Sequence, residues 1–208
     1  MKRKLWNKDT ILMLQGNAVS ALGDILYSVA IGYWVYEKTG SSALMGIMSS
    51  ISMFMTMLVM PFSGSIIDKC SRKLIIVGMD ALRGVMLALG VLAFADSLSV
   101  PVVLAAAFLA SACSVFFSPS VSTLMLDIIP HDDMVRGQSV FSGVNSFINL
   151  VGKAISGALV AFLGVPLIVL LNGVSYLVSA FTELFITVPK TVHQGEKITL
   201  GGIFADFR

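Results

Sequence analysis

Ionisable and amide side chains interrupt several long apolar segments of this chain, and such groups are costly in apolar surroundings. Asp24 is the one charged residue within residues 10–36. At helical spacing it shares a face with Asn17, Ser20 and Tyr27. Such a stripe forms either the wall of a water-filled pathway or a structural hydrogen bond between helices. Asp24 is therefore a candidate proton- or substrate-binding residue, with Asn17 and Tyr27 beside it.

A second polar stripe lies in a later apolar segment. It consists of Asn145, Asn149, Lys153 and Ser156, spaced by four, four and three residues. Lys153 and Asp24 have similar predicted depths in their segments, so we expect them to form an ion pair. Two interpretations remain open for this pair. It is either a switch, opened by protonation of Asp24 or by arrival of a substrate, or a permanent structural contact.

A short cationic loop is predicted at residues 64–73, with the pattern Gly-x-x-x-Asp-Lys-x-x-Arg-Lys. A solubilising turn needs only positive charge, whereas this pattern also places an acid between its cations. Its candidate functional residues are Gly64, Asp68, Lys69, Arg72 and Lys73.

Motifs of enzyme chemistry are missing from the sequence. It has no His-Glu-x-x-His zinc pair, no Gly-x-Ser-x-Gly elbow and no Walker phosphate loop. Cys70 and Cys113 have no disulfide or metal spacing, and both histidines fall in predicted loops. We therefore expect no enzymatic activity, no cofactor, no metal site and no nucleic-acid partner.

The composition decides what kind of element positions these residues. Hydrophobic residues make up 56% of the 208 residues and charged ones 12%, and the mean hydropathy is +0.90. These values are typical of integral membrane proteins. The charges cluster between apolar runs of ~20 residues or more, enough to cross a bilayer as helices. A barrel would show alternating segments of about ten residues instead. The sequence predicts an all-α membrane protein.

Six transmembrane helices are predicted, and they form one domain over residues 1–189. Their approximate ranges are 10–36, 43–67, 74–95, 100–129, 138–163 and 165–188. Glu183 follows Asn172, Ser175 and Ser179 on one face of the last helix, and we expect it at the cytoplasmic interface. Small residues of the fourth helix, including Ser111, Ser114, Ser118 and Ser122, are expected to let helices approach closely.

Lysine and arginine are distributed unequally between the two sides of these spans, which predicts the orientation. One side has only Lys38. The other has Lys2, Arg3, Lys4, Lys8, Lys69, Arg72, Lys73, Arg136, Lys190, Lys197 and Arg208. We therefore expect both termini to be cytoplasmic, in a bacterial-type plasma membrane.

With these features assembled, the sequence resembles the N-terminal half of a major facilitator superfamily transporter. Within that superfamily it is similar to the bacterial drug-efflux group that includes macrolide-efflux permeases. Residues 64–73 match the signature loop between the second and third helices, and Asp80-Ala-Leu-Arg83-Gly84 matches the Asp-x-x-Arg-Gly pattern. Segments similar to the efflux group are Gln15-Gly16, Ser20-Ala-Leu-Gly23-Asp24, Thr39-Gly40-Ser41 and Asn172-Gly-Val-Ser-Tyr176.

The resemblance implies a six-helix bundle made of two inverted three-helix repeats. This is half of a fold whose substrate lies near the midplane between two bundles. Residues 190–208 would then be a cytoplasmic tail or the start of the central linker. In the family, the acid of the signature loop holds the outward-facing state together with nearby cations and an acid at the end of the fourth helix. Those roles fall on Asp68, Arg72 and Asp127, and Asp80 and Arg83 would extend the cluster.

The resemblance also implies a function. The leading hypothesis is proton-driven efflux of drugs or other amphipathic organic molecules by alternating access, with Asp24 as the coupling acid. Antiporters of the superfamily often have Gly-Pro in the fifth helix, where this chain has Gly152 followed by Lys153. The alternative is a truncated or split membrane protein without autonomous transport. The expected partners are a small organic substrate, protons, the lipid bilayer and a second six-helix bundle, encoded beyond this chain, as a separate chain or as a second copy.

Overall fold

Each long apolar segment of the chain forms a helix. The computed structural model describes residues 5–94 and 99–187, and those residues contain no strand. The helices are α1 (Lys8–Thr39), α2 (Ser42–Lys69), α3 (Arg72–Phe94), α4 (Val100–Ile128) and α5 (Met134–Glu183), with a 3-10 turn, η1 (His131–Asp133), before α5. All five α-helices are long and apolar enough to cross a membrane, which agrees with the predicted all-α membrane fold.

Local sequence signals fix where the first helices begin and end. The side chain of Asn7 accepts a hydrogen bond from the Thr10 amide (2.8 Å) and so caps α1. Gly40 ends this helix in the left-handed conformation (φ 63°) and donates its amide to Tyr36 (2.7 Å). Ser41 then caps α2. The turn between the two helices is therefore encoded by adjacent residues.

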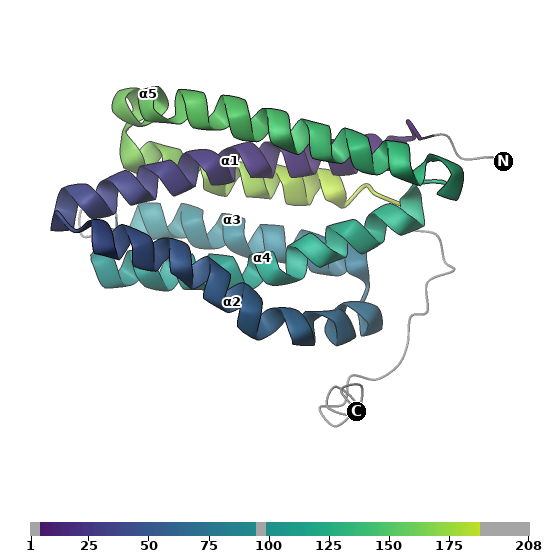
Figure 1. Cartoon of the computed structure of the whole chain (residues 1–208), viewed down its shortest axis with the longest axis horizontal. Coiled ribbons are helices and arrows are strands. Elements are labelled where there is room, and N and C mark those ends of the chain that lie inside the picture. Colours follow the sequence, from purple (N-terminus) through teal and green to yellow (C-terminus); the bar gives the residue numbers. More distant parts are fainter. Residues whose placement is uncertain (1–4, 95–98, 188–208) are drawn as a thin grey trace.

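The α5 element contains a chain reversal. At Gly164 the backbone has φ 74° and ψ 159°, a conformation that is essentially restricted to glycine. The two arms, residues 134–163 and 165–183, run in opposite directions, and both pack against α1 (Figure 1). They correspond to the last two predicted spans. The second arm, however, ends at Glu183 and not at residue 188, because the amide of Ile186 bonds to Glu183 in a tighter turn (3.1 Å).

The connection between α2 and α3 is shorter than predicted. Residues 64–69 continue α2, so only Cys70 and Ser71 separate the two helices. The expected loop at residues 64–73 is therefore mostly helical, because its apolar Ile66 and Ile67 continue the helix that precedes them.

Two apolar clusters occupy opposite ends of the bundle. One includes Ala30 of α1, Leu87 of α3 and Val169 of α5, and the other includes Met13 of α1, Ile76 of α3 and Ile186, which follows α5. The intervening turns of each helix carry the buried polar residues Ser20, Asp80, Arg83, Asn172 and Ser179. A polar layer thus lies midway along α1, α3 and α5, between two apolar ends.

The ends of the described chain meet at one end of the bundle. The amide of Thr187 donates to the carboxylate of Asp9 (2.9 Å), and the Lys73 ammonium donates to the carbonyl of Leu184 (2.7 Å). The side-chain amide of Asn7 reaches the carbonyl of Ile128 (3.3 Å). This end of the bundle is the one that carries the predicted cytoplasmic cations Arg72 and Lys73.

The division of the bundle into two inverted three-helix repeats stays a prediction.

Candidate functional site

Asp80 and Arg83 form an ion pair within the polar layer. They are one helical turn apart on α3, and their residue exposures are 0% and 2%. Ser20 of α1 donates a further hydrogen bond to Asp80 (3.3 Å). A buried charge requires this pairing, because an isolated one would cost several kcal/mol.

Arg83 is also held between two aromatic rings. Its guanidinium carbon lies 4.6 Å from the ring centre of Phe117 and 4.3 Å from that of Tyr176. The same guanidinium donates to the Tyr176 hydroxyl (3.2 Å) and to Ser114 of α4 (3.3 Å). Arg83 therefore joins α3, α4 and the second arm of α5.

Tyr176 links this pair to the acid predicted from the sequence. Its hydroxyl donates a hydrogen bond to Asp24 of α1. Three helices thereby connect Asp24 through Tyr176 to Arg83 and Asp80. The contacts in this chain of residues are all hydrogen bonds or ion pairs. A change in the charge of Asp24 therefore changes the strength of the hydrogen bonds that Tyr176 and Arg83 make.

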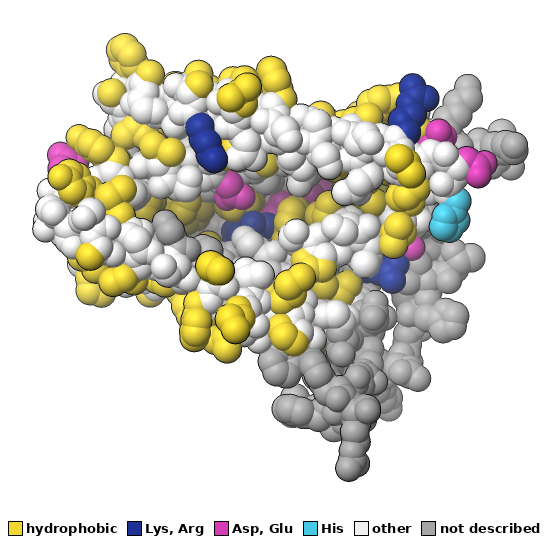
Figure 2. Space-filling view, viewed as in Figure 1, with side chains coloured by type: hydrophobic (Ala, Val, Ile, Leu, Met, Phe, Trp, Pro, Cys, Tyr) yellow, Lys and Arg dark blue, Asp and Glu magenta, His cyan; other side chains and the backbone are white. Residues whose placement is uncertain are grey.

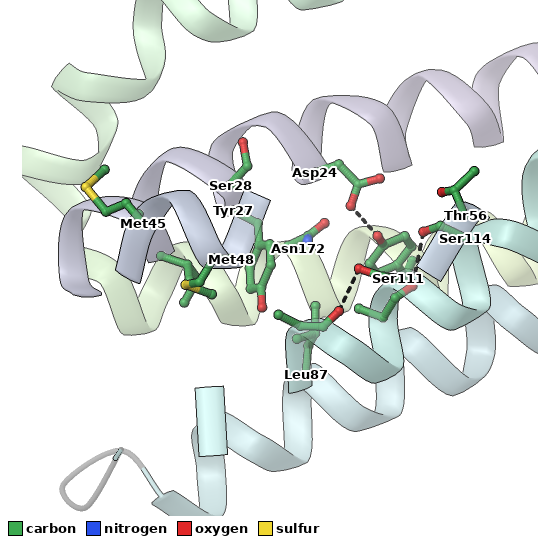
Figure 3. A pocket seen from close by; sticks show the side chains of 15 residues that line it. Asp24, Tyr27, Ser28, Met45, Met48, Thr56, Leu87, Ser111, Ser114 and Asn172 are labelled. Carbon is green, nitrogen blue, oxygen red and sulfur yellow. Dashed lines mark hydrogen bonds between the residues drawn. The ribbon is translucent and has the colours of Figure 1, made fainter. Parts of the chain in front are cut away.

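Asp24 lies where two cavities meet. The first has a volume of about 410 Å³ and is lined by apolar residues, among them Ile31, Met45 and Met48, with polar groups at Ser111 and Asn172 (Figure 3). Flexible methionines adapt to ligands of different shape. This cavity has the composition of a site for a small, largely apolar molecule.

The second cavity has a volume of about 290 Å³ and a more polar wall. Asn17, Ser118, Gln138 and Asn145 line it, and Arg83 contributes its charge. Asp24 and Ser114 line both cavities. Figure 2 shows the corresponding hollow in one face of the molecule, with acidic and basic side chains inside it. A solute moving between the cavities would therefore pass Asp24.

Glycines let the helices approach closely enough to build this layer. A Cβ added to Gly84 of α3 would lie 2.9 Å from the backbone oxygen of Gly173, and one added to Gly23 of α1 would collide with the Asn172 side chain. The glycines of these helices therefore serve the contacts among α1, α3 and α5.

The structure brings together some of the predicted residues. The side-chain amide of Asn17 donates to Asn145 (3.0 Å), which joins the two predicted polar stripes. Tyr27 lines the first cavity beside Asp24. Asn149 is exposed and donates to the backbone of its own helix, at Asn145 (3.1 Å).

The expected Asp24–Lys153 ion pair was wrong. Asp24 is bonded to Tyr176, and the Lys153 side chain is exposed and forms no ion pair with described residues. Equal depth in two helices does not bring residues together. The face of the first α5 arm that packs on α1 carries Gly152, where an added Cβ would lie 3.1 Å from Ile25 and 3.3 Å from Leu22.

The predicted switch cluster divides into two parts. Arg72 and Asp127 form an ion pair at 2.7 Å, and Lys73 caps the end of α5. Gly64 is exposed on α2. The side chains of Asp68 and Lys69 lie outside the described part of the structure.

Asp80 and Arg83 were expected to extend the cluster of Arg72 and Asp127, and the structure shows that they do not. Arg83 lies eleven residues after Arg72, about three helical turns along α3. Three turns carry it from the end of the bundle into the polar layer beside Asp24.

Three residues of the layer escaped prediction as functional residues. Glu183, the last residue of α5, is 1% exposed and accepts a hydrogen bond from Ser179 (3.2 Å), and its expected position at the cytoplasmic interface stays a prediction. Tyr176 and Ser114 were assigned no binding role. The one signal in the sequence was the stripe from Asn172 to Glu183, which follows helical spacing to the end of the segment.

Among the described residues, no group of three His, Cys, Asp or Glu side chains is placed to hold a metal ion.

Residues 13–203 match the family model of the Major Facilitator Superfamily. The chain belongs to the major facilitator superfamily. This membership and the five long apolar helices identify a multi-pass membrane protein.

Two curated relatives of this superfamily protein are named as an efflux protein and a putative exporter. Macrolide efflux protein A of Streptococcus pyogenes is 22% identical over 188 residues, which are 89% of this chain and 46% of that protein. The putative bacilysin exporter BacE of Bacillus subtilis is 31% identical over 178 residues, which are 81% of this chain and 42% of that protein. The chain spans less than half the length of both relatives.

Proposed function

We propose that this superfamily member takes part in proton-coupled efflux of an amphipathic organic molecule by alternating access. The observation that carries the proposal is the position of Asp24 at the junction of both cavities. A substrate in the larger cavity would contact the same carboxylate that binds the proton. The names of the relatives, a macrolide efflux protein and a putative bacilysin exporter, support an exported organic substrate.

The proposed coupling acts through the hydrogen bond between Tyr176 and Asp24. When Asp24 is ionised, the tyrosine hydroxyl and the nearby Arg83 stabilise its negative charge. Protonation of Asp24 weakens these contacts, so Asp80 becomes the one ionised acid that pairs with Arg83 in this site. The contacts among α1, α3 and α5 therefore differ between the two protonation states, which is what a shift between conformations requires.

Substitution Asp24→Asn tests this proposal. We expect substrate efflux driven by a pH gradient to fall at least about tenfold, equivalent to ~1.4 kcal/mol. Efflux of a fluorescent amphipathic cation from proteoliposomes, with and without the gradient, measures the effect. Ser28→Ala is the matched control, because Ser28 lines the same cavity but bonds only to its own helix, at Ile25 (2.8 Å). Equal gradient dependence in Asp24→Asn and wild type would refute the proposed role.

Assembly with a second six-helix bundle completes this proposal. Lys153 is exposed within a predicted span, where an uncovered cation is costly. A second bundle over the hollow face would cover it, whether that bundle belongs to the same gene, to a separate chain or to a second copy. If this chain transports only with such a bundle, it has no autonomous activity. Cross-linking of Lys153→Cys in membranes, followed by mass analysis of the product, distinguishes a second copy from another chain.

A further inference from the structure

Glu183 is a buried acid that no part of the proposed coupling uses. It ends the second arm of α5, is 1% exposed and lines none of the cavities described above. One carboxylate oxygen, Oε1, accepts a hydrogen bond from the Ser179 hydroxyl (3.2 Å). The other, Oε2, is buried without a hydrogen-bond partner among the described residues.

Within the part of the chain that the structure describes, the surroundings of Glu183 supply no cation of its own. From α1, Gly16 faces it so closely that an added Cβ would lie 3.1 Å from Oε1. From α3, the charged groups that act on it are Asp80 and Arg83, which already pair with each other. Lys73, also on α3, bonds to the backbone carbonyl of the following residue, Leu184. An ionised Glu183 would be a buried and unpaired charge.

Charge balance over the whole cluster leads to the same result. Asp24, Asp80 and Glu183 supply three acids, and among the described residues Arg83 is the one base that interacts electrostatically with all three. Asp80 pairs directly with Arg83, and Asp24 is partly exposed to two cavities. Glu183 is 1% exposed and has no cation of its own among the described residues, so its neutral form costs far less.

We propose that Glu183 is a second proton-binding residue, which holds its proton as a neutral carboxylic acid in the conformation described here. The acid interacts electrostatically with Asp80 and Arg83, and hydrogen bonds lead from Arg83 through Tyr176 to Asp24. Movement of the second α5 arm that exposes Glu183 would break its O–H bond and pass the proton to water at the end of the bundle that carries Lys73. The inference deepens the proposed proton coupling, but the protonation of Glu183 can be measured without transport.

Infrared spectroscopy of the full chain in lipid vesicles tests this directly. A protonated carboxylic acid has a carbonyl stretch that is separate from the amide and carboxylate bands. We expect wild type at neutral pH to show this band, Glu183→Gln to lose it, and Asp24→Asn to retain it. Ser179→Ala removes the hydrogen bond to Oε1 and should shift the same band to higher frequency, so this milder variant tests the assignment even if Glu183→Gln fails to fold.

The outcomes separate this inference from the proposed function. An unchanged band in both Glu183→Gln and Ser179→Ala would overturn it. So would a band that appears only after sodium is removed, because the site would then hold a metal ion and not a proton. If Asp24→Asn leaves gradient-driven efflux unchanged while Glu183→Gln loses the band, the proposed coupling fails and the second proton site stands.

Discussion

Arg83 is the residue on which the polar layer depends. Its guanidinium contacts side chains from α3, α4 and α5, including Asp80, Ser114 and Tyr176. A planar guanidinium presents several donors in fixed directions and stacks on aromatic rings, whereas an ammonium does neither. The layer is therefore specific for arginine and not merely for positive charge.

Substitution Arg83→Ala should destabilise the protein strongly. It leaves Asp80 buried and unpaired, for which the expected cost is about 3–5 kcal/mol. Arg83→Lys keeps the charge but lacks the planar guanidinium, with its fixed donors and its stacking on aromatic rings. The loss of stability in this variant should therefore be smaller than in Arg83→Ala. Thermal unfolding in detergent, followed by circular dichroism, measures both. Arg136→Ala is the matched control because Arg136 is exposed at the end of the bundle. Equal stability of Arg83→Ala and Arg136→Ala would contradict the buried ion pair.

At this scale the sequence predicted part of the site. Asp24 and Asn17 follow from polar spacing in an apolar segment, and both line a cavity. Tyr176 and Glu183 did not follow in the same way. Their roles depend on which face of the second α5 arm meets α1 and α3, and one helix alone does not determine that choice.

At the scale of elements, the contact between α3 and α5 determines where Arg83 meets Tyr176. Gly84 and Gly173 face each other across this contact, and a Cβ added to Gly173 would lie 3.0 Å from the Ala88 backbone nitrogen. Without side chains at these two positions the backbones approach closely, as small residues permit in membranes. A wider separation would pull Tyr176 away from both Arg83 and Asp24.

Substitution Gly84→Ala should separate these two helices. The added methyl group would lie 2.9 Å from a backbone oxygen, which cannot move without shifting α5. We expect a loss of about 1–3 kcal/mol, typical of an overpacked contact. Gly78→Ala on the same helix is the matched control, because no atom lies within 4 Å of its added Cβ, and it should be neutral or slightly stabilising. Thermal unfolding of the two variants makes the comparison. Equal stability of the two variants would contradict the close contact at Gly84.

At the scale of the whole molecule, orientation in the membrane remains a proposal. The positive charges predict that the end with Arg72 and Lys73 is cytoplasmic. The structure places the first and last described residues at this same end, where Thr187 bonds to Asp9. Both termini on one side of the membrane also require an even number of crossings. The reversal at Gly164 provides this by dividing α5 into two arms.

Labelling of Cys70 tests the orientation. Cys70 is partly exposed at the turn between α2 and α3, whereas Cys113 is buried in α4. A membrane-impermeant maleimide should label Cys70 in inverted vesicles and leave it unlabelled in intact cells, because the positive charges hold this turn in the cytoplasm. Gel-shift analysis of the Cys113→Ser variant measures the reaction. Cys70→Ser is the control and should show no labelling. Labelling of intact cells would reverse the proposed topology.

The sequence by itself determined the membrane class, the apolar helices and the turn signals, because these depend on composition, on spacing and on adjacent residues such as Gly40 and Ser41. It also singled out Asp24, since a lone acid in an apolar run is costly wherever the helix packs. Only the tertiary structure decided the partner of that acid. Tyr176 and not Lys153 forms a hydrogen bond with Asp24. Arg83 and Glu183 are both buried within the bundle. The physical reason is that helical spacing fixes the neighbours within one helix, whereas glycine contacts between helices fix the rotation that brings separate faces together.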